Sequence, residues 1–229
     1  MAMLTVIGPN GQATHPFKLV LVGGVTWTPT FSVNVNLIGN NLTVINKSGA
    51  GQGTCVYPEV AQSTGAIYWE INWTGLLNTT LQGGIGLCTI EAIADFGQLA
   101  ADATGGCILR PDGTVWVNGQ VANPLDPNFK YLPVQAEGDT VGILANFTQP
   151  DSLIVTFLGV AGGVVNNIGG QFLLPAGNYI PAAVFDSASV FDIYAQTANF
   201  GADVNSLLGP TVFPDFGWDG VTLGWPNTA

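Results

Sequence analysis

One glutamate stands where a sugar-cleaving enzyme could carry its acid. In the stretch STGAIYWEINW, residues 63–73, the carboxylate of Glu70 lies between Trp69 and Trp73 in a chain with few charges. Glycoside hydrolases act with two carboxylates that lie roughly 5 to 9 Å apart. On a β-strand, the side chains that share a face with Glu70 are two or four positions away. The stretch lacks a second carboxylate, because the residues nearest on that face are Tyr68, Asn72 and Thr74.

The alternative interpretation of this stretch is structural. Its alternation divides the residues into two faces, Ile67, Trp69, Ile71 and Trp73 on one and Tyr68, Glu70 and Asn72 on the other. A strand of a β-sandwich separates its core face from its opposite surface in this way. We therefore predict that Glu70 is a framework carboxylate, hydrogen-bonded to a neighbouring strand.

The remaining acids and the histidine form no catalytic set. Glu91 and Asp95 are four residues apart, a spacing that we interpret as the solvated side of a loop or short turn. A Ser/His/Asp triad would have to use His15, the only histidine, which is followed by Pro16 in the N-terminal arm. We therefore expect no enzymatic activity.

Metal and cofactor sites are equally unsupported. The three cysteines, Cys55, Cys88 and Cys107, form no CxxC pair and are interpreted as plain buried thiols. The sequence contains no phosphate-binding loop, dinucleotide fingerprint, nucleophile elbow or calcium loop. We therefore expect neither a cofactor nor a metal.

Composition narrows the partners. The 229 residues include 47% hydrophobic and only 8% charged side chains, with four Lys and Arg against fifteen Asp and Glu. The resulting net charge of −11 repels phosphate backbones, which argues against nucleic acid. No uninterrupted apolar run reaches the roughly 20 residues of a spanning helix, so membrane insertion is not expected. The N-terminus also lacks the pattern of a cleaved signal peptide.

The elements that must position any site are short strands. Alternating apolar and polar residues, separated by Gly, Pro, Asn and Asp, indicate strands almost throughout. Turns are predicted at Asn40-Asn41, at 110–113 and at 149–152. One or two helical turns at most are predicted within 90–103. The predicted strands are Phe31–Ile38, Leu42–Ile45, Cys55–Tyr57, Ile67–Trp73, Ile85–Cys88, Cys107–Leu109, Val115–Val117, Thr140–Asn146, Leu153–Leu158, Tyr179–Phe185 and Val190–Thr197.

Ten or more short strands without intervening helices predict two packed antiparallel sheets or a barrel. No composition break suggests a second domain. We expect a central β-domain over residues 25–203, preceded by an apolar arm over 1–24 that is a possible attachment element. Residues 204–229 are rich in aromatic residues, Pro and Gly. Such an extension wraps its own sandwich or docks onto a neighbour.

A series of motifs in order carries a family resemblance. They are NLTV at 41–44, STGAIYWEI at 63–71, GGIGLC at 83–88, DGTVWVNG at 112–119, EGDTVGILANF at 137–147, LIVTFLG at 153–159, GNYIPAAVFD at 177–186 and ANFGA at 198–202. Together they cover about 160 residues. The chain in this respect resembles the SPRY (B30.2-like) family, in particular the stand-alone SPRY-like proteins of bacteriophages. It differs in having LIVTFLGVAGG where the family usually ends with FF-x-NG.

The resemblance implies a fold and a kind of function. The family fold is a bent sandwich of two antiparallel sheets, a jelly roll similar to legume lectins such as concanavalin, and its members usually bind other proteins through loops. Two motifs also have a direct physical interpretation. In Gly138-Asp139, the carboxylate should accept a backbone N–H in a tight turn, and Gly142 should let a ring approach closely. In Asn199-Phe200-Gly201, the ring should anchor the last strand in the core.

Aromatic residues in loops are the candidates for binding. Exposed aromatics fill pockets in a partner or stack on sugars. In the loop NPLDPNFKYLP, 123–133, the candidates are Asn128, Phe129 and Tyr131. Near the C-terminus they are Trp218 and Trp225, for which the favoured alternative is that they cap the open ends of the sandwich.

The sequence therefore predicts a non-enzymatic binding or structural module. The resemblance favours a protein on the surface of a phage particle, as a capsid decoration or a tail-associated accessory protein or adhesin. Its expected partners are other virion proteins and a host cell-surface protein or glycan, and a homo-oligomer is possible. The alternative is a free, lectin-like carbohydrate-binding protein.

Overall fold

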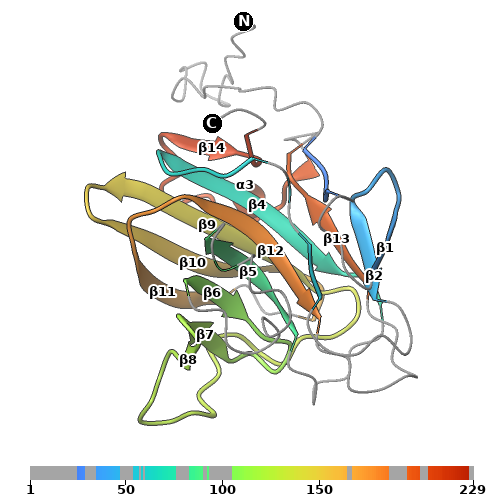
Figure 1. Cartoon of the computed structure of the whole chain (residues 1–229), viewed down its shortest axis with the longest axis horizontal. Helices are drawn as coiled ribbons and strands as arrows, with labels where there is room; N and C mark the ends of the chain where they lie inside the picture. Colours follow the sequence, from blue (N-terminus) through green and yellow to red (C-terminus); the bar gives the residue numbers. More distant parts are fainter. Residues whose placement is uncertain are drawn as a thin grey trace, which may run out of the picture.

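The computed structural model describes residues 25–28, 35–46, 54–56, 58, 60–75, 83–89, 92, 105–163, 167–185, 195–201 and 206–226. These residues form two mainly antiparallel sheets that pack face to face (Figure 1). The predicted all-β sandwich is thereby confirmed. The arm 1–24 and nearly all of the predicted helical stretch 90–103 lie outside the described residues.

The larger sheet has eight strands. Its order is β1-β2-β13-β4-β9-β10-β11, and β14 pairs with β4 in parallel, on the same side as β13. In Figure 1, β1 and β11 lie at opposite edges of this sheet. The strands are β1 (Val35–Ile38), β2 (Thr43–Asn46), β4 (Ala66–Trp73), β9 (Thr140–Gln149), β10 (Ser152–Ala161), β11 (Asn167–Pro175), β13 (Ala195–Asn199) and β14 (Val221–Leu223).

The smaller sheet has six strands in the order β3-β12-β5-β6-β7-β8. All of its pairs are antiparallel. The strands are β3 (Thr54–Val56), β5 (Gly84–Thr89), β6 (Gly106–Leu109), β7 (Val115–Val117), β8 (Gln120–Val121) and β12 (Tyr179–Phe185).

Each predicted strand overlaps an observed one, with ends that differ by one to a few residues. Residues 31–34 and 190–194 of two predicted strands lie outside the described residues. The prediction missed β8, β11, β14 and the short helix α3 (Gly209–Val212). β11 contains Gly169 and Gly170 and ends at Pro175, so its sequence has the composition of a loop.

The predicted turns are present. Asn40 and Asn41 both adopt positive φ, at 57° and 61°, between β1 and β2. Between β6 and β7, the N–H of Gly113 donates to the carbonyl of Arg110 at 3.0 Å, and Gly113 has a φ of 87°. Such left-handed conformations favour asparagine and glycine.

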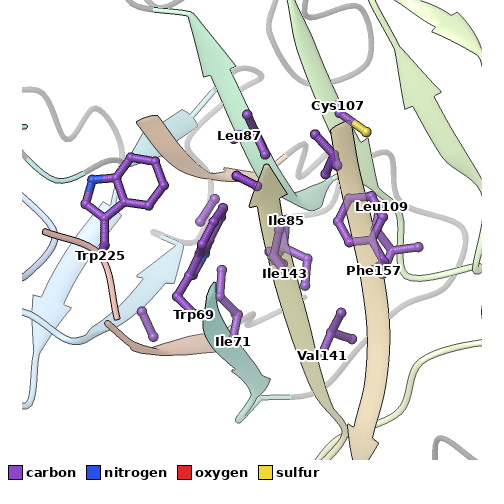
Figure 2. Close-up of a cluster of buried hydrophobic side chains, with 14 of the residues drawn as sticks. Trp69, Ile71, Ile85, Leu87, Cys107, Leu109, Val141, Ile143, Phe157 and Trp225 are labelled. Atoms are coloured by element: carbon purple, nitrogen blue, oxygen red, sulfur yellow. The ribbon is translucent and has the colours of Figure 1, made fainter. Parts of the chain in front are cut away.

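The core lies between the sheets. Figure 2 shows Trp69 and Ile71 of β4 together with Ile143 of β9 and residues of the smaller sheet. The predicted core face of β4 is confirmed, because Ile67, Trp69, Ile71 and Trp73 are all at most 2% exposed. Burial of large apolar side chains on both sheets supplies the main driving force for this fold.

The outer face of β4 is also covered, which its sequence did not indicate. Residues 206–226, here called the C-terminal segment, pack Leu207 and Trp218 against Tyr68 of β4 and Leu158 of β10. The segment then returns to the sheet as β14. The C-terminal segment is thus part of the sandwich, as one of the two predicted alternatives required.

The two motifs with a physical interpretation behave as predicted. Asp139 accepts a hydrogen bond from the N–H of Ala136 at 2.7 Å and another from Gly163. A Cβ on Gly142 would lie 2.1 Å from the hydroxyl of Tyr68, so glycine is required there. Phe200 is buried and packs edge-on against Trp27, with ring centroids 4.9 Å apart. No helix in the described part of the chain is long and apolar enough to cross a membrane.

Candidate functional site

The 122–135 loop, between β8 and β9, carries the most exposed apolar side chain described. Leu125 is 96% exposed, Phe129 is 45% exposed and Val134 is 43% exposed. Exposed charges lie beside them on Asp126, Lys130 and Glu137. The loop therefore offers an apolar tip with a charged surround, which is how protein-binding surfaces are commonly built.

Hydrogen bonds within the loop fix its backbone. The side-chain oxygen of Asn123 accepts from the N–H groups of Leu125 and Asp126, at 3.2 and 3.3 Å. The Asp126 carboxylate in turn accepts from the N–H of Asn128 at 3.2 Å, and the Asp126 carbonyl accepts from Phe129 at 2.9 Å. Such Asx turns mimic a backbone turn. The prolines at 124, 127 and 133 restrict φ further.

The second half of the loop is attached to the sandwich. The N–H of Tyr131 donates to the carbonyl of Gly113, and the N–H of Gln135 donates to the carbonyl of Pro111, at 2.8 and 2.7 Å. Leu132 is buried in the core between these two bonds. The β6–β7 turn therefore holds the loop in place.

A series of rings connects the loop to the core. Phe129 packs edge-on against Tyr131 at 4.9 Å between centroids, and Tyr131 packs edge-on against Phe172 of β11 at 4.8 Å. Phe172 contacts the fully buried Phe157 of β10, with centroids 5.9 Å apart. Edge-to-face ring pairs contribute about 0.5–1.5 kcal/mol each beyond their buried area. The exposed Phe129 is consequently positioned by the core.

The loop candidates from the sequence therefore lie together, although Asn128 contributes an exposed side chain only. Leu125 was missed because no aromatic residue marks it. The signal that could have identified it is an apolar residue between prolines, Pro124-Leu-Asp-Pro127, in a loop of polar composition.

The C-terminal candidates lie elsewhere and are buried. Trp225 is fully buried, packs edge-on against Trp69 and donates its indole N–H to the carbonyl of Val60 at 2.7 Å. Trp218 is 8% exposed and donates to the carbonyl of Phe213 at 2.7 Å. Neither ring is available to a partner in this conformation. Both match the alternative in which they cap the sandwich.

Glu70 is buried, and its contacts differ from the predicted ones. One carboxylate oxygen accepts three hydrogen bonds, from the Tyr68 hydroxyl at 2.8 Å and from the N–H groups of Leu208 and Gly209 at 2.6 and 2.8 Å. The prediction of a neighbouring strand as partner was wrong, because the C-terminal segment supplies both N–H groups. The framework role is supported by this set of donors.

The electrostatics of this pair follow from its burial. Desolvation raises the pKa of Glu70, and the hydrogen bonds from Gly209, Tyr68 and Leu208 partly offset that rise. Desolvation and the neighbouring Glu70 raise the pKa of Tyr68 well above its usual range, so Tyr68 remains a donor. Among the described residues, no group of three or more His, Cys, Asp and Glu side chains could hold a metal ion.

The sequence matches no family model and no curated protein. Solved structures do resemble the fold. The SPRY domain of human HERC1 superposes with a TM-score of 0.52 at 13% identity, over 75% of this chain and 96% of that chain. Another human SPRY domain gives a TM-score of 0.49 at 12% identity, over 75% of this chain and 98% of that one. The likeness to the HERC1 domain shows that the chain has the fold of a SPRY β-sandwich.

Proposed function

We propose that this SPRY-type sandwich is a non-catalytic protein-binding module that contacts its partner through the 122–135 loop. The observation that carries the proposal is Leu125, which is 96% exposed at a position where its neighbours' backbone groups are hydrogen-bonded to Asn123. An apolar side chain on a fixed backbone loses little conformational entropy when it is buried by a partner. Such side chains act as anchors at interfaces.

Phe129 extends the same surface. Its ring is partly exposed and its position is set by Tyr131. Interfaces are enriched in aromatic anchors surrounded by polar residues. Asp126 and Lys130, both exposed, provide charges of opposite sign beside this apolar pair. The buried Glu70, which already accepts three hydrogen bonds, is unsuited to act as a catalytic acid.

A selection experiment tests the binding role. A displayed peptide library is selected against the purified chain, and the affinity of the enriched peptides is measured for the wild type, Leu125→Ser and Phe129→Ser. We expect each variant to weaken binding at least roughly tenfold, as for an interface anchor. Ile38→Ser is the matched control, because Ile38 is an exposed apolar residue on β1. Peptides that bind all four proteins equally would contradict the assignment of the loop.

The finer proposal is a protein of the phage particle surface, as a capsid decoration or tail-associated protein. Its support is the resemblance in sequence to phage-encoded SPRY-like proteins and the composition poor in Lys and Arg. Immunogold labelling of purified particles with an antibody to the chain tests the location. Deletion of residues 1–24 tests the predicted attachment element, since undiminished incorporation into particles would exclude it.

The lectin alternative is separated by the same variants. The purified chain is applied to an array of neutral and acidic glycans. Sugar binding that is lost on Phe129→Ala or Tyr131→Ala would favour the lectin over the protein-binding module. Absence of glycan binding together with peptide binding would favour the module.

A further inference from the structure

The two sheets have outer strands of very different length. In the described part of the chain, the outer strands are β1 with four residues, β3 with three, β8 with two and β11 with nine. Natural sheets usually keep outer strands short or protect them with charged residues, because an open edge pairs with other strands. β11 therefore differs from the other three edges.

The hydrogen-bond pattern shows which groups of β11 face away from β10. The N–H of Ala176 donates to the carbonyl of Asp151, and the register continues with Leu174 opposite Leu153 and Phe172 opposite Val155. In an antiparallel pair, residues alternate between those bonded to the partner strand and those that are not. The backbone groups of Gln171, Leu173 and Pro175 therefore point to the outer edge.

The side chains along this edge are exposed and uncharged. Gln171, Leu173 and Pro175 are all exposed, and Leu173 is 67% exposed. Opposite Leu173 on β10 lies the partly exposed Ile154. No Asp, Glu, Lys or Arg occurs from Ser152 to Phe185. The edge thus lacks the charges that normally prevent pairing.

The other half of β11 is occupied by its own chain. A Cβ on Gly170 would lie 3.0 Å from the ring of Tyr131, and one on Gly169 would lie 2.9 Å from Leu132. The 122–135 loop therefore covers residues 169 and 170. The accessible edge is the stretch from Gln171 to Pro175.

We propose that a second copy of this chain pairs with that edge, β11 against β11 in antiparallel orientation, around a twofold axis at Leu173. An antiparallel pair of identical strands is self-complementary, as an isologous dimer requires. Leu173 and the partner's Leu173 exchange two backbone hydrogen bonds. The N–H of Gln171 donates to the carbonyl of the partner's Pro175, and the symmetric bond forms as well.

Pro175 is compatible with this arrangement. Proline has no N–H, but in this register its carbonyl alone is needed. On the outer face, Ile154, Leu173 and the equivalent residues of the partner form one apolar row across the twofold axis. Cross-strand apolar pairs stabilise sheets.

Charge favours this edge over the rest of the surface. Two copies that each carry a net charge of −11 repel one another. A stretch of 34 residues without a charge, from Ser152 to Phe185, reduces this repulsion locally. The neutral β11 edge is therefore where two copies can approach most closely.

Sedimentation velocity over a range of concentrations tests the dimer. We expect the wild type to dimerise below about 100 μM, and Leu173→Lys to raise the dissociation constant at least roughly tenfold, because it places two like charges opposite each other. Leu125→Lys is the matched control and should dimerise as the wild type does. A wild type that stays monomeric, or a dimer indifferent to Leu173→Lys, overturns the proposal.

Cross-linking tests the register. Bonded antiparallel pairs have Cα atoms about 5.5 Å apart, within the range of a disulfide. Mild oxidation should therefore convert Leu173→Cys into a covalent dimer that a reductant reverses. Gln171→Cys, which lies opposite the partner's Pro175, should cross-link far less. Equal cross-linking of the two variants, or none in Leu173→Cys, contradicts the pairing around Leu173.

Discussion

Tyr68 donates its hydroxyl hydrogen to Glu70 at 2.8 Å, and two glycines from different parts of the chain enclose this pair. Gly142 belongs to the adjacent strand β9, and Gly209 begins the helix α3 of the C-terminal segment. The pair therefore joins the sheet to the segment that covers it.

The first prediction concerns the pH dependence of stability. Because desolvation raises the pKa of Glu70 in the folded chain, the folded state retains a proton that the unfolded state releases. The stabilisation is fully present below the unfolded pKa of about 4.3 and is lost as the pH rises through the folded pKa. Urea unfolding of the wild type and Glu70→Gln across this range should show their difference in free energy changing with pH.

The comparison of the two proteins isolates Glu70 from the other acids. Stability curves that run parallel for the wild type and Glu70→Gln would contradict the prediction. Glu70→Ala, in contrast, leaves three buried donors without their acceptor, and should cost about 2–4 kcal/mol at any pH.

The second prediction concerns the space around Tyr68. A Cβ on Gly142 would lie 2.1 Å from the Tyr68 hydroxyl and 2.6 Å from its ring. Gly142→Ala should therefore destabilise the fold by roughly 2–3 kcal/mol, the cost of overpacking a rigid site. Gly163→Ala serves as control, since its Cβ would lie 3.4 Å from the nearest atom. Equal effects of the two substitutions in thermal unfolding would refute the argument.

The third prediction concerns the attachment of the 122–135 loop. Lys130 is exposed and precedes Tyr131, whose ring packs between Phe129 and Phe172. Tyr131→Ala removes both ring contacts and should accelerate trypsin cleavage after Lys130 about tenfold, the factor that corresponds to one edge-to-face pair. Phe129→Ala, which leaves Tyr131 on Phe172, should have a smaller effect. The fragments are identified by mass spectrometry, and unchanged cleavage in Tyr131→Ala would show that the rings do not hold the loop.

The fourth prediction concerns Trp225. Its ring is fully buried against Trp69, and its indole N–H is bonded to Val60. Trp225→Ala should destabilise the chain by about 3–5 kcal/mol, as for other buried tryptophans. Phe213→Ala, in a partly buried position of the same C-terminal segment, should cost less. If Trp225→Ala unfolds at the wild-type urea midpoint, the C-terminal segment is dispensable to the fold.

The sequence predicted the strands whose signal is local. In β4, alternation of large apolar and polar residues identified the core face correctly, because Trp69 and Ile71 are buried by the opposite sheet. β11 was missed because Gly169 and Gly170 interrupt its alternation. Its strand conformation depends on pairing with β10 and on the packing of Leu132 and Tyr131. Neither contact can be read from the strand itself.

The candidate site was predictable in part for the same reason. Proline and asparagine marked 123–133 as a surface loop, and Phe129 and Tyr131 were recognised as aromatic residues within it. The partner of Glu70 was not predictable, because Leu208 and Gly209 are more than 130 residues away in sequence. Only the tertiary structure brings such groups together.

The parallel pairing of β14 with β4 also constrains the order of assembly. The first half of β4 pairs with β9 on one side, but its other side waits for Val221–Leu223. The slot beside Trp69 is likewise filled only by Trp225. Contacts between such distant residues form late, because the intervening chain must first be ordered. A nascent chain therefore leaves the ribosome with Trp69 incompletely packed, and the last twenty residues close the domain only after synthesis has passed them.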